Sequence, residues 1–434
     1  RFVWITQNKF VYLHMVKFLS SGNITMDKVY IHPIWESVSV HPCIDSLSMV
    51  YIYDITNDTE VVINLKNIDN HTTTLDKFTF KFNESYIYDN KSFLNILQIP
   101  NSFDASLVKY LQSNSPLQSN LTPTHTFYHR RFNSLKGVNN LIPISKHIES
   151  IRDVKDEFLQ YYDLGGENFD CVKKFENFYI KPLNLVERNG IHTTNGLEWT
   201  QYHPYTLTSR PSNNYGGVNY AALNKEDGSR DRFVSRFEGG KLVQFDYDAY
   251  HPRIIGKMVG EPIPLDVSGH QTLADMYGVS YGDSKGITFR QLYGGVQEEY
   301  LHIPLFSKVS HKIDKMWMEF NRRGYIETPL GRKLSKENLN DMNANKLFNY
   351  MLQATETELN MKILSKVMGF LEEKQSKMVL YTYDSYLLDV HPSENELLKN
   401  LKILIEGNGF PTKVEMGNRY SEMKSIDLEI NGII

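Results

Sequence analysis

The chain has 434 residues, of which 41% are hydrophobic and 23% are charged, a balance that is ordinary for a soluble globular protein. This length predicts two or three domains at roughly 100–200 residues each, and the composition excludes disorder, collagen and coiled coil as overall descriptions. The formal net charge of −4 gives no global positive field for nucleic acid, although a DNA-binding cleft needs only a local stripe of positive charge.

The cysteine content and the hydropathy of the chain indicate in which kind of cellular compartment the protein is expected. The two cysteines, Cys43 and Cys171, lie far apart and cannot make a disulfide framework or a four-ligand zinc site, so we expect a reducing compartment such as the cytoplasm. No apolar run approaches the ~20 residues of a membrane helix, and no signal peptide precedes the first residues, so we expect no membrane partner. Because the chain begins at Arg1 without a methionine, we expect some N-terminal sequence to be missing.

The residues up to about Ser145 predict a mixed α/β domain with short elements. Segments Met49–Asp54 and Glu60–Asn64 predict two strands joined by a turn at Thr56–Thr59, which makes a hairpin. Helical spacing and polar composition further predict helices at 92–97, 105–111 and 147–162, and a loop at 112–123.

The second half of the chain is more helical and holds most of the candidate functional residues. Two short apolar runs, Lys241–Phe245 and Met378–Tyr383, are each followed by an aspartate, Asp246 and Asp384. Between these runs, helices are predicted at 271–277, 285–293, 307–322 and 345–372.

The two aspartates form the first candidate site. A carboxylate at the end of a buried strand is held rigidly, and Mg²⁺ prefers few protein carboxylates, completing its shell with water and phosphates. Asp246 and Asp384 can meet only if their strands pair in one sheet. Alternatively, each aspartate simply begins a turn, as Asp commonly does after strands.

A helix face forms the second candidate site. Lys285, Phe289 and Tyr293 are spaced at i, i+4 and i+8 and therefore share one face. A cation, an aromatic ring and a phenol in a row suit a nucleotide, with the ammonium at the phosphates and the rings at sugar and base. The alternative is an amphipathic helix with an aromatic core stripe.

A third candidate is the turn-rich segment Thr208–Asn219, which contains Arg210. Such a loop can grip a backbone phosphate or a minor-groove base edge, or it can be an ordinary polar loop.

The order of these elements resembles family A DNA polymerases, the group of bacterial DNA polymerase I and several phage replicases. The resemblance runs from Val186 to the C-terminus and includes seven motifs in the family's order. These are Val186–Gly190 (Ile-Glu-Arg-Asn-Gly), Thr208–Arg210 (Thr-Gly-Arg), Phe245–Arg253 (motif A), Lys285–Gly294 (motif B), Gly324–Arg332 (Gly-Tyr-Val-x-Thr-x-x-Gly-Arg), Asn349–Gln353 (Asn-x-x-x-Gln) and Tyr383–Ser385 (motif C).

The resemblance implies an α/β (α+β) fold: a right-hand polymerase palm and fingers with a reduced thumb, preceded by a degenerate ribonuclease H-like exonuclease-type domain. The implied bounds are 1–145 for the exonuclease-like domain, 146–209 for a linker, the reduced thumb and the start of the palm, 210–265 for the palm with motif A, 266–330 for the fingers with motif B, and 331–434 for the palm with motif C.

The resemblance also implies template-directed addition of deoxynucleotides to the 3′ end of a primer on primer–template DNA. Asp246 and Asp384 would hold two Mg²⁺ ions, one activating the primer hydroxyl and the other clamping the triphosphate. Catalysis would use these aspartates and Lys285. The nucleotide would contact Lys285, Phe289, Tyr293, His251 and Tyr247, and the DNA would contact Arg210, Asn219, Arg253, Asn349, Gln353 and Arg332.

Four departures from the family pattern affect these expectations. His251 replaces the motif A glutamate that crowds the sugar 2′ position, and Ser385 replaces the second motif C acid. Tyr281 stands where motif B has an arginine, so triphosphate contacts fall more heavily on Lys285. Only about 20 residues separate Gly190 from Arg210, where the family inserts a long helical thumb. We therefore expect a processivity or replisome partner, unless the segment 147–178 supplies a displaced thumb.

The N-terminal domain lacks the Asp-x-Glu that a two-metal exonuclease needs on its first strand. The nearest candidate, Ile34–Glu36, has no aspartate, and Asp104 alone does not hold two metals. We expect an exonuclease-like fold without activity, and hence no proofreading.

Two other functions stay open from the sequence. Single-subunit RNA polymerases share the three main motifs and often carry His-Asp-Ser at the last, which Tyr383–Ser385 approaches. Phe289, the bulky His251 and the Thr-Ser-Arg segment favour DNA synthesis instead. The second alternative is a catalytically inactive, DNA-binding subunit, although the presence of Asp246, Lys285 and Asp384 together opposes it. The divergence and small size favour a phage or other viral origin.

Overall fold

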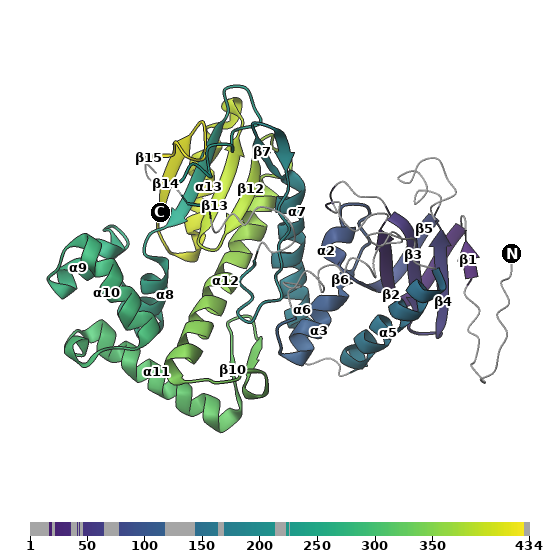
Figure 1. The fold of residues 1–434 in the computed structure, drawn as a ribbon, viewed down its shortest axis with the longest axis horizontal. Helices are drawn as coiled ribbons and strands as arrows, with labels where there is room; N and C mark the ends of the chain where they lie inside the picture. Colours follow the sequence, from purple (N-terminus) through teal and green to yellow (C-terminus); the bar gives the residue numbers. More distant parts are fainter. Residues whose placement is uncertain are drawn as a thin grey trace. The chain divides into compact units, whose positions relative to one another are not determined.

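The computed structural model of the chain divides into two compact units, drawn in Figure 1. Unit 1 lies within Arg1–Ala105 and Tyr128–Glu157, and unit 2 lies within Ser106–Phe127 and Phe158–Ile434. The expected first domain, 1–145, thus overlaps unit 1 without sharing its bounds. The structure describes residues 17–19, 22–35, 41, 43, 47–64, 78–117, 144–163, 169–212, 223–224 and 226–428.

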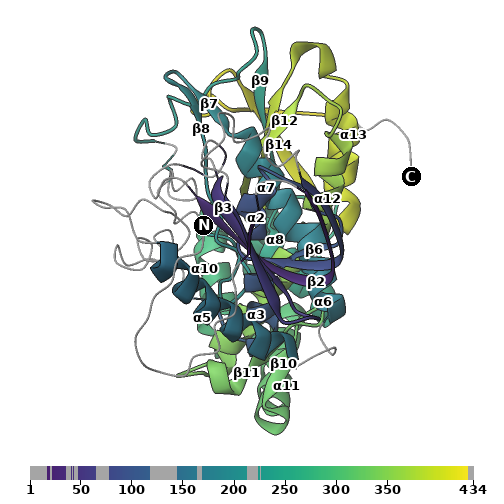
Figure 2. The same cartoon turned by 90° about the vertical axis from the view of Figure 1, so that its right-hand side faces the viewer.

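Unit 1 is built on a six-stranded mixed sheet with the order β1-β4-β3-β2-β5-β6. The pairs β2–β3 and β3–β4 are antiparallel, whereas β1–β4, β2–β5 and β5–β6 are parallel. Figure 2 shows the twist of this sheet. The strands are β1 (Lys17–Leu19), β2 (Gly22–Trp35), β3 (Leu47–Asp54), β4 (Thr59–Asn64), β5 (Phe78–Ile87) and β6 (Ser102–Asp104).

The predicted hairpin is confirmed as β3 and β4. Asp54 ends β3, and its Oδ1 accepts hydrogen bonds from the backbone N–H groups of Thr56 (2.9 Å) and Asn57 (3.1 Å). This side chain turns the backbone locally, which is why Asp is common where strands end. The core beneath includes Val29, Ile31 and other buried apolar residues of the strands.

Helix α2 (Asn90–Phe93) lies between β5 and β6, and helices α3 (Ala105–Ser113) and α5 (Ile144–Asp163) follow β6. The second and third confirm predicted helices. The helix predicted at 92–97 is shorter, because its last residues form turns instead. Helix α5 is tied to β4 by an ion pair of Arg152 with Glu60, whose Oε2 also accepts the hydroxyl hydrogen of Tyr51 at 2.7 Å.

In unit 2, α6 (Phe169–Phe175) continues through a π-helical turn (Glu176–Ile180) into α7 (Lys181–Asn189). Gly190 then reverses the chain with φ = 57°, and a Cβ there would lie 2.8 Å from the carbonyl oxygen of Glu198. The hairpin β7 (Ile191–Thr193) and β8 (Gly196–Glu198) follows. All residues from Gly190 to Arg210 are described, and none is helical, so this segment holds no helical thumb.

The main sheet of unit 2 has the order β12-β13-β9-β14-β15, and every pair of neighbours is antiparallel. The strand that contains Asp246 (β9) and the strand that precedes Asp384 (β12) therefore share a sheet, but they do not pair directly, because β13 lies between them. The strands are β9 (Lys241–Tyr247), β12 (Lys377–Thr382), β13 (Ser385–Val390), β14 (Thr412–Gly417) and β15 (Lys424–Ile426).

A long helix, α12 (Ala344–Phe370), runs through unit 2 and contacts α7, α8, α10, α11 and α13 (Figure 1). All four helices predicted between the aspartates are confirmed, with α12 ending two residues earlier than expected. The other elements are α8 (Tyr250–Val259), α9 (Gly269–Tyr277), α10 (Tyr281–Gly294), α11 (Pro304–Arg323), β10 (Tyr325–Glu327), β11 (Lys333–Ser335) and α13 (Leu397–Ile405). Among the described helices, none is long and apolar enough to cross a membrane.

The pair of Glu60 with Arg152 yields a prediction for unit 1. Burial by itself raises the pKa of Glu60, but the hydrogen bonds from Arg152 and Tyr51 outweigh it and lower the pKa below the usual 4.5. A lowered folded-state pKa contributes stability that is present above about pH 4.5 and is lost as the pH falls through the folded-state value. We expect Glu60→Gln to cost about 2 kcal/mol near pH 7 and to flatten the acid limb of the stability curve.

Urea unfolding of unit 1 between pH 3 and 7 measures both effects. Asp153→Asn, which changes an exposed carboxylate on α5, is the control and should leave the curve unchanged. Equal curves for Glu60→Gln and the control would contradict the role of the pair.

Candidate active site

The sheet of unit 2 brings Asp246 and Asp384 together. Asp246 lies on β9 directly opposite Ser385 of β13, and Asp384 occupies the turn just before Ser385. The backbone N–H of Tyr247 donates to the carbonyl oxygen of Asp384 at 3.1 Å. The backbones of the two aspartates therefore lie side by side, although Asp246 lies within its strand rather than after it, and their role as metal ligands stays a prediction.

The turn that carries Asp384 is held by a buried polar chain. Tyr383 has a left-handed backbone, with φ = 57°, and its carbonyl oxygen accepts a hydrogen bond from Asn360 Nδ2 at 2.7 Å. Asn360 Oδ1 in turn accepts from the hydroxyl of Tyr250 at 2.7 Å. Asn360 was not singled out from the sequence, because its role depends on a contact with a turn 23 positions away.

The electrostatics around Asp384 favour a cation. Burial raises the pKa of its carboxyl, and the carboxylate of Glu356 raises it further, whereas Arg210 and His251 lower it. A divalent cation would offset the repulsion between such carboxylates. Within the part of the chain that the structure describes, no group of three or more His, Cys, Asp or Glu side chains could hold a metal. Two carboxylates still fit Mg²⁺, which takes its remaining ligands from water and phosphates.

The segment Thr208–Arg210 is fixed from several sides. Ser209 has φ = 59°, its hydroxyl accepts from Arg332 Nη1 at 3.0 Å, and its carbonyl oxygen accepts from the hydroxyl of Tyr179 at 2.7 Å. The next residue, Arg210, lays its guanidinium 3.7 Å from the ring centroid of Tyr383. A cation is thus placed beside the turn of Asp384.

Asn349 and Gln353 lie on the same face of α12, four residues apart. Gln353 Oε1 accepts a hydrogen bond from the hydroxyl of Thr208 at 3.3 Å, and Asn349 Nδ2 donates to the carbonyl oxygen of Tyr293 at 3.0 Å. These side chains connect α12 with the Thr208–Arg210 segment and with the C-terminal turn of α10. Asn219 lies outside the described residues.

Helix α10 carries the predicted face. Ser280 caps its N-terminus by accepting from the backbone N–H of Asp283. Phe289 is 54% exposed, unusual for a large apolar ring, and its ring stacks on that of Tyr293 with centroids 5.6 Å apart. Exposure of Phe289 opposes the alternative of a core stripe and leaves a ring available to a ligand.

Two lysines and a histidine lie near the start of α10. Lys285 Nζ lies 4.9 Å from the ring of Tyr281, and the ring of His270 meets the same tyrosine edge-on. Lys413, opposite Asp246 on β14, forms an ion pair with Asp248 at 2.7 Å. Burial lowers the pKa of His270, and the charge of Lys285 lowers it further. The sequence motifs gave no signal for His270 or Lys413.

His251 lies between two elements. Its Nδ1 is hydrogen-bonded to the hydroxyl of Tyr293 on α10, and its Nε2 lies 3.1 Å from Oε2 of the buried Glu356 on α12. The glutamate had no signal in the motifs, because it lies outside the Asn349–Gln353 pattern.

Two predicted ligand contacts are corrected by burial. Arg253 is 2% exposed, and its guanidinium donates to Asp248 and to the carbonyl oxygens of Ile263, Pro264 and Val267. It serves the protein interior and does not reach a DNA phosphate. The side chain of Tyr247 is also buried, and its hydroxyl donates to the carbonyl oxygen of Ile405 at 2.6 Å, so this side chain does not reach a nucleotide.

The expected DNA contact of Arg332 is corrected for the same reason. Arg332 is 1% exposed, its guanidinium stacks 4.3 Å from the ring of Tyr110, and it donates to Ser209. The residue positions the segment before Arg210 instead.

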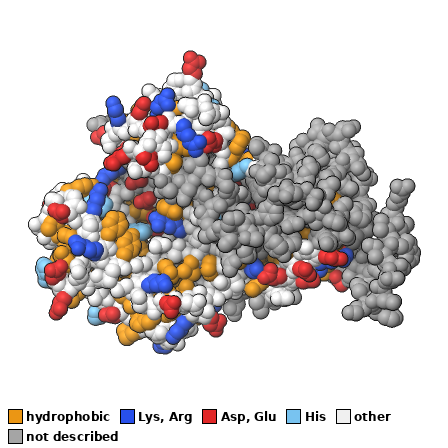
Figure 3. Space-filling model, viewed as in Figure 1, with side chains coloured by type: hydrophobic (Ala, Val, Ile, Leu, Met, Phe, Trp, Pro, Cys, Tyr) orange, Lys and Arg blue, Asp and Glu red, His pale blue; other side chains and the backbone are white. Residues whose placement is uncertain are grey.

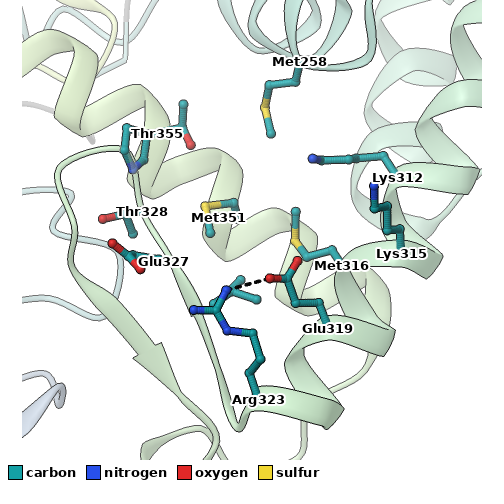
Figure 4. A pocket seen from close by; sticks show the side chains of 12 residues that line it. Met258, Lys312, Lys315, Met316, Glu319, Arg323, Glu327, Thr328, Met351 and Thr355 are labelled. Carbon is teal, nitrogen blue, oxygen red and sulfur yellow. Dashed lines mark hydrogen bonds and ion pairs between the residues drawn. The ribbon is translucent and has the colours of Figure 1, made fainter.

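A separate pocket of about 360 Å³ lies between α11, β10 and α12. Lys312 and Lys315 project from α11, and Glu319 forms an ion pair with Arg323 (Figure 4). Neither Asp246 nor Asp384 lines it. Its polar and methionine-rich lining therefore belongs to the other side of α12.

Comparisons with known proteins agree with this arrangement. No protein-family model matches the chain. The chain is 26% identical over 317 residues to the thermostable DNA polymerase I of Thermus thermophilus, covering 62% of this chain and 37% of that protein. The corresponding enzyme of Thermus aquaticus is 26% identical over 317 residues, with 62% and 36% covered. The chain thus spans little more than a third of the length of these relatives.

The fold is that of a polymerase domain. The chain resembles the solved structure of the polymerase domain of Pol1 from M. smegmatis in complex with a DNA primer–template and dNTP, with a TM-score of 0.66 and 13% sequence identity. The match covers 91% of this chain and 96% of that one. The predicted α/β polymerase fold and the resemblance to DNA polymerase I are therefore confirmed.

The burial of Arg332 gives a prediction that separates a positioning role from a DNA contact. We expect Arg332→Met to lower the free energy of unfolding by about 2–3 kcal/mol, because the charged donor to Ser209 is lost from a buried site. Chemical denaturation measures this change. The control Arg322→Met, at an exposed arginine of α11, should be nearly neutral. A stable Arg332→Met protein with a smaller salt dependence of DNA binding would contradict the correction.

Proposed function

We propose that this chain, a divergent relative of the family A DNA polymerases, is a template-directed DNA polymerase that extends a primer with deoxynucleotides. The observation that carries the proposal is the juxtaposition of Asp246 on β9 with Asp384 in the turn before its partner strand β13, beside Arg210. The sequence similarity to the Thermus polymerases supports the same activity. The sheet of unit 2 with α12 would be the palm, and α9 to α11 would be the fingers.

Asp246 and Asp384 would hold the divalent cations, which we propose to be two Mg²⁺ ions. Such ions, when bound, supply charge neutralisation at the primer hydroxyl and at the triphosphate. The protein contributes rigidity: the register of β13 against β9 and the hydrogen bond from Asn360 keep the two carboxylates in place. No carboxylate has to move into position during nucleotide addition.

The exposed face of α10 would bind the incoming nucleotide. Lys285 at its N-terminal half would meet the triphosphate, with His270 and Lys413 nearby as further donors. The stacked rings of Phe289 and Tyr293 would pack on the sugar and base. Because position 281 is a tyrosine, Lys413 is the cation best placed to supplement Lys285.

The primer–template would pass over Arg210, Asn349 and Gln353, which are only partly buried. Their amide and guanidinium donors suit the acceptors that correct base pairs share in the minor groove. Asn219 is proposed for the same surface on the family resemblance alone.

Two other functions are less well supported. A single-subunit RNA polymerase is not favoured, because the similar proteins are DNA polymerases. An inactive DNA-binding subunit has no physical need for Asp246 and Asp384 side by side, since two unneutralised carboxylates repel each other.

Unit 1 would be an exonuclease-type domain without activity. Its sheet combines an antiparallel β2–β3–β4 arrangement with parallel β5 and β6, which supports this assignment. Asp104 is buried at the end of β6, whereas Glu36 lies outside the described residues. We propose that the chain does not proofread.

A processivity partner is proposed for the same enzyme. The short β7–β8 hairpin leaves few groups to grip a duplex behind the active site. On the face drawn in Figure 3, basic and acidic side chains are interspersed over unit 2, and the net charge is −4, so no broad positive field compensates.

The central test is Asp384→Asn. We expect primer extension to fall about a thousandfold or more, because the loss of one carboxylate weakens cation binding and charge stabilisation, whereas affinity for primer–template should change little. Single-turnover extension and DNA-binding assays measure the two effects. Asp275→Asn, at an exposed site on α9, is the matched control, and near-normal extension by Asp384→Asn would refute the assignment.

Processivity gives a separate prediction. In a single-encounter extension assay with a DNA trap, the isolated chain should add only about tens of nucleotides, because few phosphate contacts slow its dissociation. Products of hundreds of nucleotides without a partner would show that another segment, such as residues 147–178, acts as a thumb.

A further inference from the structure

Glu356 is a buried carboxylate in the middle of α12, next to the aspartate pair but outside every motif of the family resemblance. It is 1% exposed. Its Oε2 lies 3.1 Å from Nε2 of His251 and 3.5 Å from Nε of Arg210. Burying a carboxylate this deeply costs free energy unless charged or hydrogen-bonding partners lie close to it. The positions of His251 and Arg210 next to Glu356 therefore matter for the stability of this region.

The imidazole of His251 is engaged at both nitrogens. Nε2 faces Glu356, and Nδ1 is hydrogen-bonded to the hydroxyl of Tyr293. A histidine ring otherwise turns freely over a broad range about its last torsion. Nδ1 is held by this hydrogen bond, and Nε2 lies within ion-pair distance of Glu356 without hydrogen-bond geometry, so α12, α8 and α10 meet through these three side chains.

We propose that Glu356 is the positioning residue that holds His251 against the sugar 2′ position and so sets the preference for deoxynucleotides over ribonucleotides. The role rests on the proposed polymerase function. His251 occupies the place of the motif A glutamate that crowds the 2′ position in the family. In this chain the carboxylate stands behind the residue at that place, on the neighbouring helix, and the imidazole is the part that meets the sugar.

The contact with Arg210 strengthens the argument. Arg210 stacks on Tyr383, next to Asp384. Glu356 therefore pairs with one cationic group at the aspartate turn and with one ring at the nucleotide face. Removing the Glu356 carboxylate would weaken its contacts with Arg210 and with His251. Only the weaker contact with His251 would change the discrimination between deoxyribose and ribose. If Glu356 only stabilised the fold, its substitution would leave the discrimination between the two sugars unchanged, so this discrimination is the property to measure.

The chain offers a matched control on the same helix. Glu358 is also 1% exposed, two residues further along, but its Oε2 accepts from the backbone N–H of Leu330 at 2.6 Å. Burial raises the pKa of Glu358 to about 7, so a neutral glutamine is a mild change there. Glu358→Gln therefore tests the effect of altering a buried acid on α12 without altering the support of His251.

The experiment measures kcat/KM for one deoxynucleotide and for the matching ribonucleotide on the same primer–template with Mg²⁺. We expect Glu356→Gln to lower the deoxy-to-ribo ratio about tenfold, the effect of weakening one close contact between buried side chains, and Glu358→Gln to leave it unchanged. Equal ratios for Glu356→Gln and wild type, or equal losses for both variants, would overturn the proposal.

A second pair of variants tests the position of the carboxylate. His251→Glu alone places two acids side by side and should impair extension by repulsion. Adding Glu356→Ala should restore extension and discrimination, because the carboxylate then occupies the motif A place. If the double variant is no better than His251→Glu, the proposal is wrong, and this comparison holds even if Glu356→Gln folds poorly.

Failure of the proposed function is distinguishable from failure of this role. A folded wild-type chain that extends no primer with either sugar would refute the polymerase function and the role together. A wild-type chain that extends primers but whose discrimination ignores Glu356 would refute the role alone.

Discussion

The pairing of β13 with β9 is the constraint on which the rest of the site depends. Asp246 and Ser385 are opposite each other, so the turn before Ser385 must place Asp384 beside Asp246. A slip of one residue would turn the side chain of Asp246 to the other face of the sheet and separate the carboxylates. Both faces of β13 are buried, and Asp389 on this strand is paired with Arg236 at 2.9 Å, so a slip would separate a buried carboxylate from its partner.

Helix α12 connects the two aspartates with the other elements of the candidate site. Asn349, Gln353, Glu356 and Asn360 recur at intervals of four, three and four residues, which places them on one face. Each contacts a different element: Asn349, Gln353 and Asn360 are hydrogen-bonded to the end of α10, the Thr208–Arg210 segment and the Tyr383 turn, and Glu356 lies 3.1 Å from His251 of α8. The buried part of this polar face, Glu356 and Asn360, requires partners, and the neighbouring elements supply them.

The sequence was sufficient for elements whose pattern is local. The spacing of Lys285, Phe289 and Tyr293 predicted α10, and the apolar runs at the two aspartates predicted β9 and β12. These predictions were possible because the side chains on one face of a helix, or within a buried strand, follow a regular pattern in the sequence. Arg253 and Arg332 were misjudged, since a buried arginine has the same letter as an exposed one and only the surrounding carbonyl oxygens and rings reveal its role. Glu356 and Asn360 were missed because their partners are distant in sequence.

The departures from the family pattern acquire a common physical explanation. Two motif positions that lose a charged residue have a charged side chain beside them in space: Glu356 lies 3.1 Å from His251, and Lys413, on β14, interacts with Tyr281. The electrostatic potential at a site depends on where the charged side chains lie in space, and not on their positions in the sequence. At positions 251 and 281, a charged side chain from another element thus lies beside a motif residue that has itself diverged.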